Sequence, residues 1–302
     1  MRTRIVVNRS AGQGHAGRVL DEARLFLDRY GVVSDLVYTR APGQGTELAL
    51  QAALEGYERV VAMGGDGTTN EVANGLLQAA EQGHEAALGV IPAGSGNDFA
   101  YGVGIPRQLE QACERLATGR LRTVDVVRVT VDGQPRIFDN SAGLGYDADV
   151  LLEARKITRV RGFLLYLWAV LRVWANNGRW PYPMTVTVDG RPLPGQALTL
   201  VAVANGPRAG GGFFLTPEAR VDDGWLDICA AAPVGRLEIL WLLPKTLNGT
   251  HVHARPVTML RGKRVVVEGA RGLPGYMDGE VLCTAGHHLE FEILPGRLKV
   301  WC

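Results

Sequence analysis

A glycine-rich turn with one acidic residue follows a short apolar run at residues 60–63. The turn reads Gly64-Gly65-Asp66-Gly67, and apolar side chains then recur at helical spacing. A strand, a glycine turn and the start of a helix expose backbone N–H groups at the positive end of a helix dipole, which favours phosphate. Because Asp66 would repel a phosphate directly, the turn predicts a divalent cation between the two. Thr68 and Glu71 have the spacing of a capping box and are predicted to cap this helix.

Two further loops have the same position between a strand and a helix. In the loop at residues 92–98, Ser95 is suited to contacting phosphate or ribose, or to capping the next helix. Residues 12–17 form a GxGxxG motif, but an NAD site needs an acidic residue about 20 residues further on, closing the second strand. That strand ends in Val37-Tyr38-Thr39, so we do not predict NAD binding there. The chain contains no GxxxxGK[ST] motif, which excludes a P-loop.

Two acidic clusters lie in the second half of the chain. They read Asp222-Asp223-Gly224 and Asp278-Gly279-Glu280. Carboxylates beside a glycine are typical of tight turns, and they are equally suited to binding a hard cation. The second cluster is also suited to deprotonating a hydroxyl group. The residues alone leave these interpretations open.

The order of expected elements predicts an α/β domain followed by a β-rich domain. Strands and helices alternate over the first 120 residues, which indicates a parallel sheet with ligands at the carboxyl ends of its strands. From about residue 122, short strands and Asp-Gly turns predict an antiparallel β-sandwich with three inserted helices. The expected strands of the first part are 4–8, 32–38, 60–63 and 87–91, and its expected helices are 18–30, 47–55 and 68–80. The helices expected in the second part are 147–155, 163–176 and 236–247.

Composition is that of an ordinary globular protein. The 302 residues are 46% hydrophobic and 21% charged, and the net charge of +1 argues neither for nor against nucleic-acid binding. No nucleic-acid partner is predicted. Four scattered cysteines form no CxxC pair, which favours a reducing cytosol, and no signal peptide is visible. The apolar run at residues 163–171 is roughly half as long as a membrane span requires. Arg155, Lys156, Arg159 and Arg161 precede it, so this helix is either a core helix with a solvated basic end or an element that meets an anionic membrane surface.

Taken together, these motifs resemble the bacterial lipid kinases of the diacylglycerol kinase catalytic family, which are relatives of the sphingosine kinases. The matching segments follow the family order over nearly the whole chain: residues 8–12, 64–71, 92–99, 222–224 and 278–280. One departure is Arg9, which stands where the family usually has a proline. The resemblance implies a nucleotide-binding α/β domain of the NAD kinase and phosphofructokinase type at residues 1–123. It further implies a β-sandwich that binds lipid at residues 124–295, and a final strand at 296–302 that returns to the first domain.

The resemblance also implies roles for particular residues. ATP is expected to contact the following residues: Asn8, Arg9, Ser10, Ala11, Gly12, Thr39, Gly64, Gly65, Asp66, Gly67, Thr68, Thr69, Asn70 and Ser95. A structural Mg2+ is expected at the Asp223 side chain and at the backbone carbonyls of Arg220 and Trp225. Glu280 is the expected proton acceptor with Asp278 beside it, and Asp66 is expected to help hold a catalytic Mg2+.

The implied activity is transfer of the γ-phosphate of Mg-ATP to the hydroxyl of a membrane lipid, with diacylglycerol and phosphatidic acid as the leading substrate and product. The resemblance does not determine the lipid, and it leaves a homodimer open. We expect a cytoplasmic protein that contacts the inner face of the membrane peripherally. Two alternatives are an NAD kinase-like phosphotransferase, which shares the Gly-Gly-Asp-Gly turn, and a non-catalytic lipid- or nucleotide-binding protein.

Overall fold

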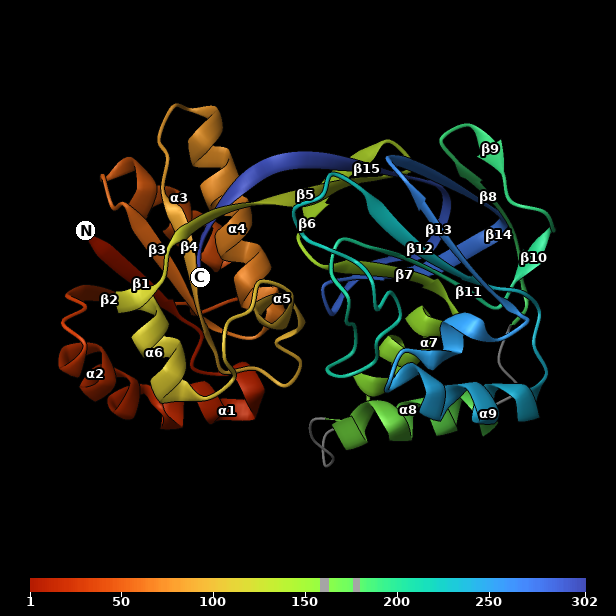
Figure 1. Ribbon diagram of the computed structural model, residues 1–302, viewed down its shortest axis with the longest axis horizontal. Coiled ribbons are helices and arrows are strands. Elements are labelled where there is room, and N and C mark those ends of the chain that lie inside the picture. The colour runs from red at the N-terminus through yellow and green to blue at the C-terminus, as the bar shows by residue number, and fades with distance from the viewer. Residues whose placement is uncertain (158–162, 176–179) are drawn as a thin grey trace. The chain divides into compact units, whose positions relative to one another are not determined.

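The computed structural model describes the backbone of residues 1–157, 163–175 and 180–302 (Figure 1). Within them the chain divides into two compact units. Unit 1 comprises Met1–Asp125 and Pro295–Cys302, and unit 2 comprises Val126–Leu294. Arg159, Arg161 and the expected helix end at residue 176 lie outside the described residues.

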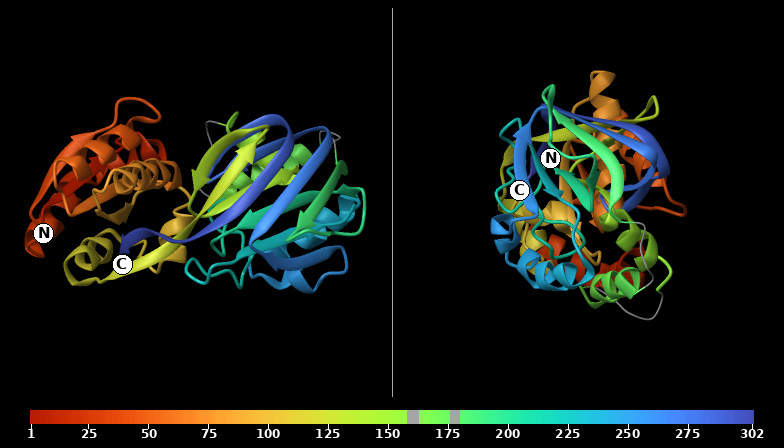
Figure 2. Two further views of the ribbon diagram at one scale, coloured as in Figure 1. Left: turned by 90° about the horizontal axis from the view of Figure 1, so that it is seen from above. Right: turned by 90° about the vertical axis from the view of Figure 1, so that its right-hand side faces the viewer.

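Unit 1 is built on a parallel sheet with strand order β2-β1-β3-β4. These strands are β1 (Thr3–Val7), β2 (Ser34–Tyr38), β3 (Arg59–Gly64) and β4 (Ala87–Pro92). β3 and β4 are buried along their whole length, as expected for strands covered on both faces. The end of β15 (Glu280–Trp301) joins the sheet parallel to β4, with Val300 opposite Leu88. In Figure 2 this blue ribbon returns beside the yellow β5 (Leu121–Val131), with which it pairs.

Helices cover both faces of this sheet (Figure 1). Ile5, Val7 and Met63 pack against α2 and α6 on one face, while α3 and α4 pack against the other. The helices of unit 1 are α1 (Ala11–Arg18), α2 (Leu20–Arg29), α3 (Gln44–Leu54), α4 (Asp66–Glu81), α5 (Asp98–Gly102) and α6 (Leu109–Thr118). The expected loop at residues 10–17 consists in the structure of two short helical segments separated by the non-helical residues 12–14, so the expectation holds in part. Left-handed backbone angles at Gly12, Gln13 and Gly14 interrupt α1.

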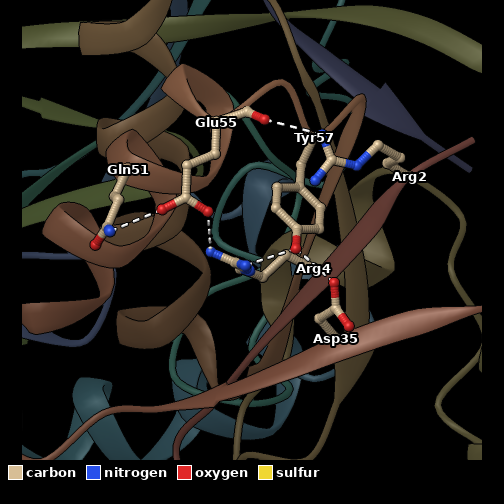
Figure 3. A network of polar contacts seen from close by, with 6 residues as sticks. All are labelled: Arg2, Arg4, Asp35, Gln51, Glu55 and Tyr57. Atoms are coloured by element: carbon tan, nitrogen blue, oxygen red, sulfur yellow. Dashed lines mark hydrogen bonds and ion pairs between the residues drawn. The ribbon is translucent and has the colours of Figure 1, made fainter.

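The amino-terminal edge of the sheet is closed by the polar network around Tyr57 (Figure 3). The guanidinium of Arg4 lies 4.0 Å from the centre of the Tyr57 ring and donates to its hydroxyl at 2.6 Å. That hydroxyl donates to Asp35 on β2 at 2.5 Å, and Arg4 forms an ion pair with Glu55 at 2.7 Å. These contacts fix the edge of the sheet opposite the carboxyl ends of the strands.

Unit 2 is a β-sandwich with an apolar core between its layers. One layer has the strand order β13-β12-β11-β7, and β7 pairs with the end of β14. In the other layer, the start of β14 pairs with β8 on one side and with β15 on the other. β14 shifts register at three points between Glu268 and Tyr276, which lets one strand serve both layers. The remaining strands are β6 (Gln134–Phe138), β7 (Ser141–Gly145), β8 (Tyr182–Val188), β9 (Arg191–Pro192), β10 (Ala197–Leu198), β11 (Leu200–Ala204), β12 (Leu226–Ala231), β13 (Val257–Gly262) and β14 (Arg264–Met277).

Three helices pack together on unit 2. They are α7 (Tyr146–Ala154), α8 (Phe163–Ala175) and α9 (Arg236–Thr246), followed by the short 3-10 helix η1 (Thr250–His253). Val150, Val170 and Ile239 contribute one buried residue from each α-helix to their shared core. The predicted fold class, an α/β domain followed by an antiparallel β-sandwich, is confirmed. Among the described helices, none is long and apolar enough to cross a membrane.

Candidate active site

The loops of unit 1 leave the sheet at a common level. Each strand ladder continues one residue beyond its strand: Thr39 N–H donates to Val7 O at 3.0 Å, and Asn8 N–H donates to Met63 O at 3.0 Å. Ala93 N–H donates to Gly64 O at 2.7 Å. The loops after β1, β2, β3 and β4 therefore start side by side at the carboxyl ends of the strands, where α/β sheets bind ligands.

Glycines allow three of these loops to touch through their backbones. A Cβ added to Gly12, which has φ +59°, would lie 2.5 Å from Ala93 O. A Cβ added to Gly94 would lie 2.2 Å from the Cα of Gly65. Any side chain at these positions would push the loops apart, so both glycines are required by the close packing of the loops, and Gly12 also by its backbone conformation.

Asp66 joins the loop after β3 to the loop after β4. Its Oδ1 accepts hydrogen bonds from the backbone N–H of Asp98 at 2.7 Å and Phe99 at 3.2 Å, and its Oδ2 accepts one from Asn97 at 2.7 Å. Burial raises the pKa of Asp66, and the three N–H donors oppose that shift. Asp66 is thus an anchor for the second glycine loop, and both of its oxygens are engaged.

The predicted capping box is wrong. The N-cap of α4 is Gly65, which provides no side-chain cap, because the helix starts two residues earlier than expected. Thr68 instead accepts a hydrogen bond from Asn8 Nδ2 at 3.0 Å, which holds the loop after β1. Glu71 binds the backbone at the start of α3. The first turn of α4 therefore has no side-chain cap, and backbone N–H groups at such a helix start suit an anion.

The other residues expected at ATP lie on the same loops. Ser10 N–H donates to Asn8 Oδ1 at 3.1 Å, and the Arg9 guanidinium lies 4.2 Å from the centre of the Tyr38 ring, next to Thr39. Ser95 lies within a loop that Asn97 closes by bonding both the N–H and the carbonyl of Gly94 at 2.9 Å. The remaining members of the set occupy the start of α1 or the first two turns of α4: Ala11, Gly67, Thr69 and Asn70.

In unit 2, Asp278 and Glu280 have different surroundings although they are two residues apart. Asp278 is buried, and its carboxylate accepts N–H hydrogen bonds from Asp139 at 2.9 Å, Asn140 at 3.2 Å and Ser141 at 2.9 Å. Glu280 is exposed and forms an ion pair with Arg155. Asp278 therefore holds the segment between β6 and β7, and Glu280 is the carboxylate accessible to a substrate.

The expected metal-binding cluster is arranged around an arginine. Asp223 accepts hydrogen bonds from Trp225 N–H at 3.2 Å and from the guanidinium of Arg261, which also lies 3.4 Å from Asp227. Arg220, whose carbonyl was expected to be a ligand, has an exposed side chain between the buried residues Ala219 and Val221. Over the described ranges, no group of three or more His, Cys, Asp or Glu is arranged to hold a metal ion. Both Asp223 and Asp66 are engaged by hydrogen-bond donors of the chain. The expected Mg2+ at Asp223 and the backbone carbonyls, and the expected role of Asp66 at a catalytic Mg2+, stay predictions.

The sequence did not single out Asp147, a carboxylate whose pKa is strongly shifted in the structure. It lies in the first turn of α7, where it accepts a hydrogen bond from the Tyr276 hydroxyl at 2.7 Å. Burial raises the pKa of Asp147 to about 6, and the Tyr276 hydrogen bond opposes the shift. The available signal was an aspartate following the short segment Gly143–Gly145, which is too weak to single out in one sequence.

The geometry defines an α/β domain whose glycine loops meet at the carboxyl ends of its strands, connected to a β-sandwich with an exposed glutamate at Glu280. The family model described as "Diacylglycerol kinase catalytic domain" matches residues 2–129 of this chain. The family model described as "YegS C-terminal NAD kinase beta sandwich-like domain" matches residues 140–302. The chain belongs to the diacylglycerol kinase catalytic-domain family and is a lipid kinase.

Curated relatives agree with this assignment, and solved structures share the fold. The chain is 31% identical to a diacylglycerol kinase from Mycobacterium tuberculosis, over 98% of this chain and 93% of the relative. It is 35% identical to a "Probable lipid kinase YegS-like" protein from Chromohalobacter salexigens, over 85% and 79% of the two chains. A Bacillus anthracis structure described as a diacylglycerol kinase shares the fold, with a TM-score of 0.73 at 23% identity over 99% and 96% of the chains. A yeast NADH kinase shares it more distantly, with a TM-score of 0.51 at 9% identity over 100% and 83%.

Proposed function

We propose that this lipid kinase transfers the γ-phosphate of ATP to the hydroxyl of a membrane lipid, with diacylglycerol as the leading substrate and phosphatidic acid as the product. The observation that carries the proposal is the meeting of three glycine loops at the carboxyl edge of the unit 1 sheet, in a chain of this family. Backbone N–H groups at such an edge suit the phosphates of a nucleotide. The curated relatives named diacylglycerol kinase support the choice of lipid.

Each part of the proposed reaction has a candidate group in this chain. The loops after β1, β3 and β4 and the first turn of α4 bind the phosphates and stabilise the charge that develops during transfer. Asp66 acts by holding the β4 loop in place. Glu280 accepts the proton of the attacking hydroxyl, and Asp278 ties the turn that precedes Glu280 to the segment between β6 and β7. Since Asp66 and Asp223 are both engaged, we assign Mg2+ to the Mg-ATP substrate and derive no step from a metal held by these side chains.

Contact with a membrane follows from the substrate and is supported by α8 and α9. Leu164 and Trp168 on α8 are 62% and 52% exposed, and Leu237 and Trp241 on α9 are 80% and 52% exposed. Trp174 Nε1 donates to Arg236 O at 2.9 Å, so the two helices lie side by side (Figure 1). Exposed tryptophan and leucine side chains near basic residues suit the interface of an anionic bilayer. We propose peripheral contact with the cytoplasmic face of a membrane through this surface.

A phosphotransfer assay in mixed micelles tests the proposed function. Labelled ATP is supplied with diacylglycerol, monoacylglycerol, phosphatidylglycerol, sphingosine or ceramide, and NAD serves as the competing acceptor. We expect label in the lipid fraction, with diacylglycerol preferred. Label in NADP alone would support the NAD kinase-like alternative, and tight binding without transfer to any acceptor would support a non-catalytic protein.

A further inference from the structure

The start of α3 is capped by a side chain from the neighbouring helix. Its own N-cap is Gly43, which has φ +85° and no side chain to accept a hydrogen bond. Glu71 in α4 supplies both acceptors: Oε1 binds Gly43 N–H at 2.7 Å and Oε2 binds Gly45 N–H at 2.8 Å. The Thr46 hydroxyl donates to the backbone carbonyl of Glu71 at 3.0 Å. One carboxylate therefore satisfies two N–H groups that the helix itself leaves without partners.

Close packing of the start of α3 against α4 brings the Glu71 carboxylate within hydrogen-bonding distance of the α3 backbone. A Cβ on Gly45 would lie 2.6 Å from Glu71 Oε2, and a Cβ on Gly75 would lie 2.3 Å from Thr46 O. The start of α3 is thus pressed onto α4 at two glycines. The carboxylate of Glu71 reaches the α3 backbone only because neither position carries a side chain.

The cap determines where the loop after β2 ends. That loop begins at Thr39, whose N–H donates to Val7 O at 3.0 Å. The next N–H, that of Arg40, donates to Gln44 Oε1 at 2.6 Å. Its far end is Gly43, which Glu71 holds. Both ends of residues 39–43 are therefore fixed, one by the sheet and one by α4.

We infer that Glu71 is a positioning residue that holds residues 39–43 in the orientation needed at the nucleotide, acting through the backbone of Gly43 and Gly45. This inference rests on the proposed use of ATP. It assigns to Glu71 a function on the β2 side of α4 that matches the function of Asp66 on the β4 side. The helix that follows the glycine turn thus holds the loops on either side of it.

Three variants test the inference. Glu71→Gln keeps one acceptor oxygen and loses the charge, while Glu71→Asp keeps both oxygens and the charge on a shorter side chain. Glu47→Gln is the matched control, because it removes the same charge from the first turn of α3 at an exposed position. For each protein we would measure the Kd for ATP by calorimetry, KM for ATP and for lipid separately, Tm, and amide hydrogen exchange over residues 39–45.

We expect Glu71→Gln to raise the Kd and KM for ATP about tenfold, as loss of a charge-assisted hydrogen bond would, with KM for lipid unchanged. Exchange at Gly43 and Gly45 should accelerate, Glu71→Asp should recover part of the ATP affinity, and Glu47→Gln should resemble the wild type. Unchanged ATP affinity in Glu71→Gln, or equal effects on ATP and lipid that follow Tm, would overturn the inference. Absence of ATP binding by the wild type would instead overturn the proposed function.

Discussion

Asp66 and Asn97 are 31 residues apart in the chain and are joined by a 2.7 Å hydrogen bond from the Asn97 N–H to Asp66 Oδ2. This bond belongs to a set of three contacts made by side chains in the first two turns of α4. Asp66 holds the loop after β4, Thr68 holds the loop after β1, and Glu71 holds the start of α3. The helix therefore fixes the relative positions of the loops proposed to bind the nucleotide.

Asp66→Asn should impair both stability and activity. An amide provides one acceptor oxygen in place of two and removes the charge, so at least one of the three N–H groups loses its partner. We expect the free energy of unfolding to fall by roughly 1–3 kcal/mol, and kcat to fall by at least about 100-fold because the β4 loop is released. Denaturant titration and initial rates provide the measurement, with Asp21→Asn on the exposed face of α2 as control. A fully active Asp66→Asn would contradict any contribution of Asp66 to the site.

Glu280→Gln should reduce kcat without weakening ATP binding. A glutamine cannot accept the hydroxyl proton, but phosphoryl transfer depends mainly on positioning and charge stabilisation. We expect a fall of roughly 10- to 100-fold, smaller than for Asp66→Asn. Glu290→Gln is the matched control because it breaks another ion pair on β15, with Arg264 at 2.6 Å. If both variants kept wild-type kcat at saturating lipid, Glu280 would not be the proton acceptor.

Asp147 should make the stability of the fold depend on pH. Burial raises its pKa from 3.8 to about 6, so between these values the native state keeps a proton that the unfolded state releases. The free energy of unfolding should therefore fall as pH rises from about 4 to 6, by on the order of 2 kcal/mol from this group.

Asp147→Asn should remove this contribution, and the difference from wild type across a pH series of urea titrations measures it. Tyr276→Phe should extend the decline to higher pH, because the Tyr276 hydrogen bond lowers the pKa of Asp147. Identical pH profiles for wild type and Asp147→Asn would contradict the raised pKa.

Membrane binding should depend on the exposed side chains of α8 and α9. Replacing Trp168 and Trp241 by alanine removes two half-exposed rings that contribute little to the core. We expect flotation with vesicles of anionic phospholipid to fall about tenfold, with kcat on short-chain lipid monomers retained. Trp225→Ala, also exposed but at the Asp223 turn, is the control. Equal flotation of the double variant and the wild type would exclude this surface.

Chelation of divalent metal should leave the stability of the nucleotide-free protein unchanged. The guanidinium of Arg261 neutralises Asp223, where the family resemblance implies a structural Mg2+, and also lies 3.4 Å from Asp227. Chelation should therefore shift Tm by less than about 1 °C, whereas added Mg2+ should raise the Tm of Arg261→Ala. Lys263→Ala controls for loss of a nearby positive charge. A marked fall in wild-type Tm on chelation would show that a metal is held despite Arg261.

Several features could be predicted because they depend on neighbours in the chain. Apolar runs and their spacing located the strands β1, β2, β3 and β4 and the helices α2, α3 and α4 to within a few residues. Asp132-Gly133 and Asp189-Gly190 have positive φ at both residues, as expected for tight hairpin turns. The same holds for Asp278-Gly279, where the hairpin interpretation of that cluster is confirmed.

Other features depended on contacts that local patterns do not contain. The helices α5 and α6 and the strand β13 were not predicted. α5 and β13 are short and are stabilised by packing on their neighbours. α6 carries Leu109, Ala112, Cys113 and Leu116 at helical spacing, a local pattern that does predict a helix and was overlooked. The capping box failed because Glu71 meets the N–H groups of α3, which are 26 and 28 residues away, more favourably than the start of its own helix.

The sequence by itself determined the order of the elements, the glycine loops and the resemblance to a lipid kinase family, since these reside in residue type and spacing. Only the tertiary structure decided what each carboxylate binds. Asp66, Glu71 and Asp278 each accept backbone hydrogen bonds from a distant segment, Asp223 is neutralised by Arg261, and Glu280 remains at the surface. The physical reason is that a buried carboxylate must find donors wherever the fold places them, and chain proximity does not specify those donors.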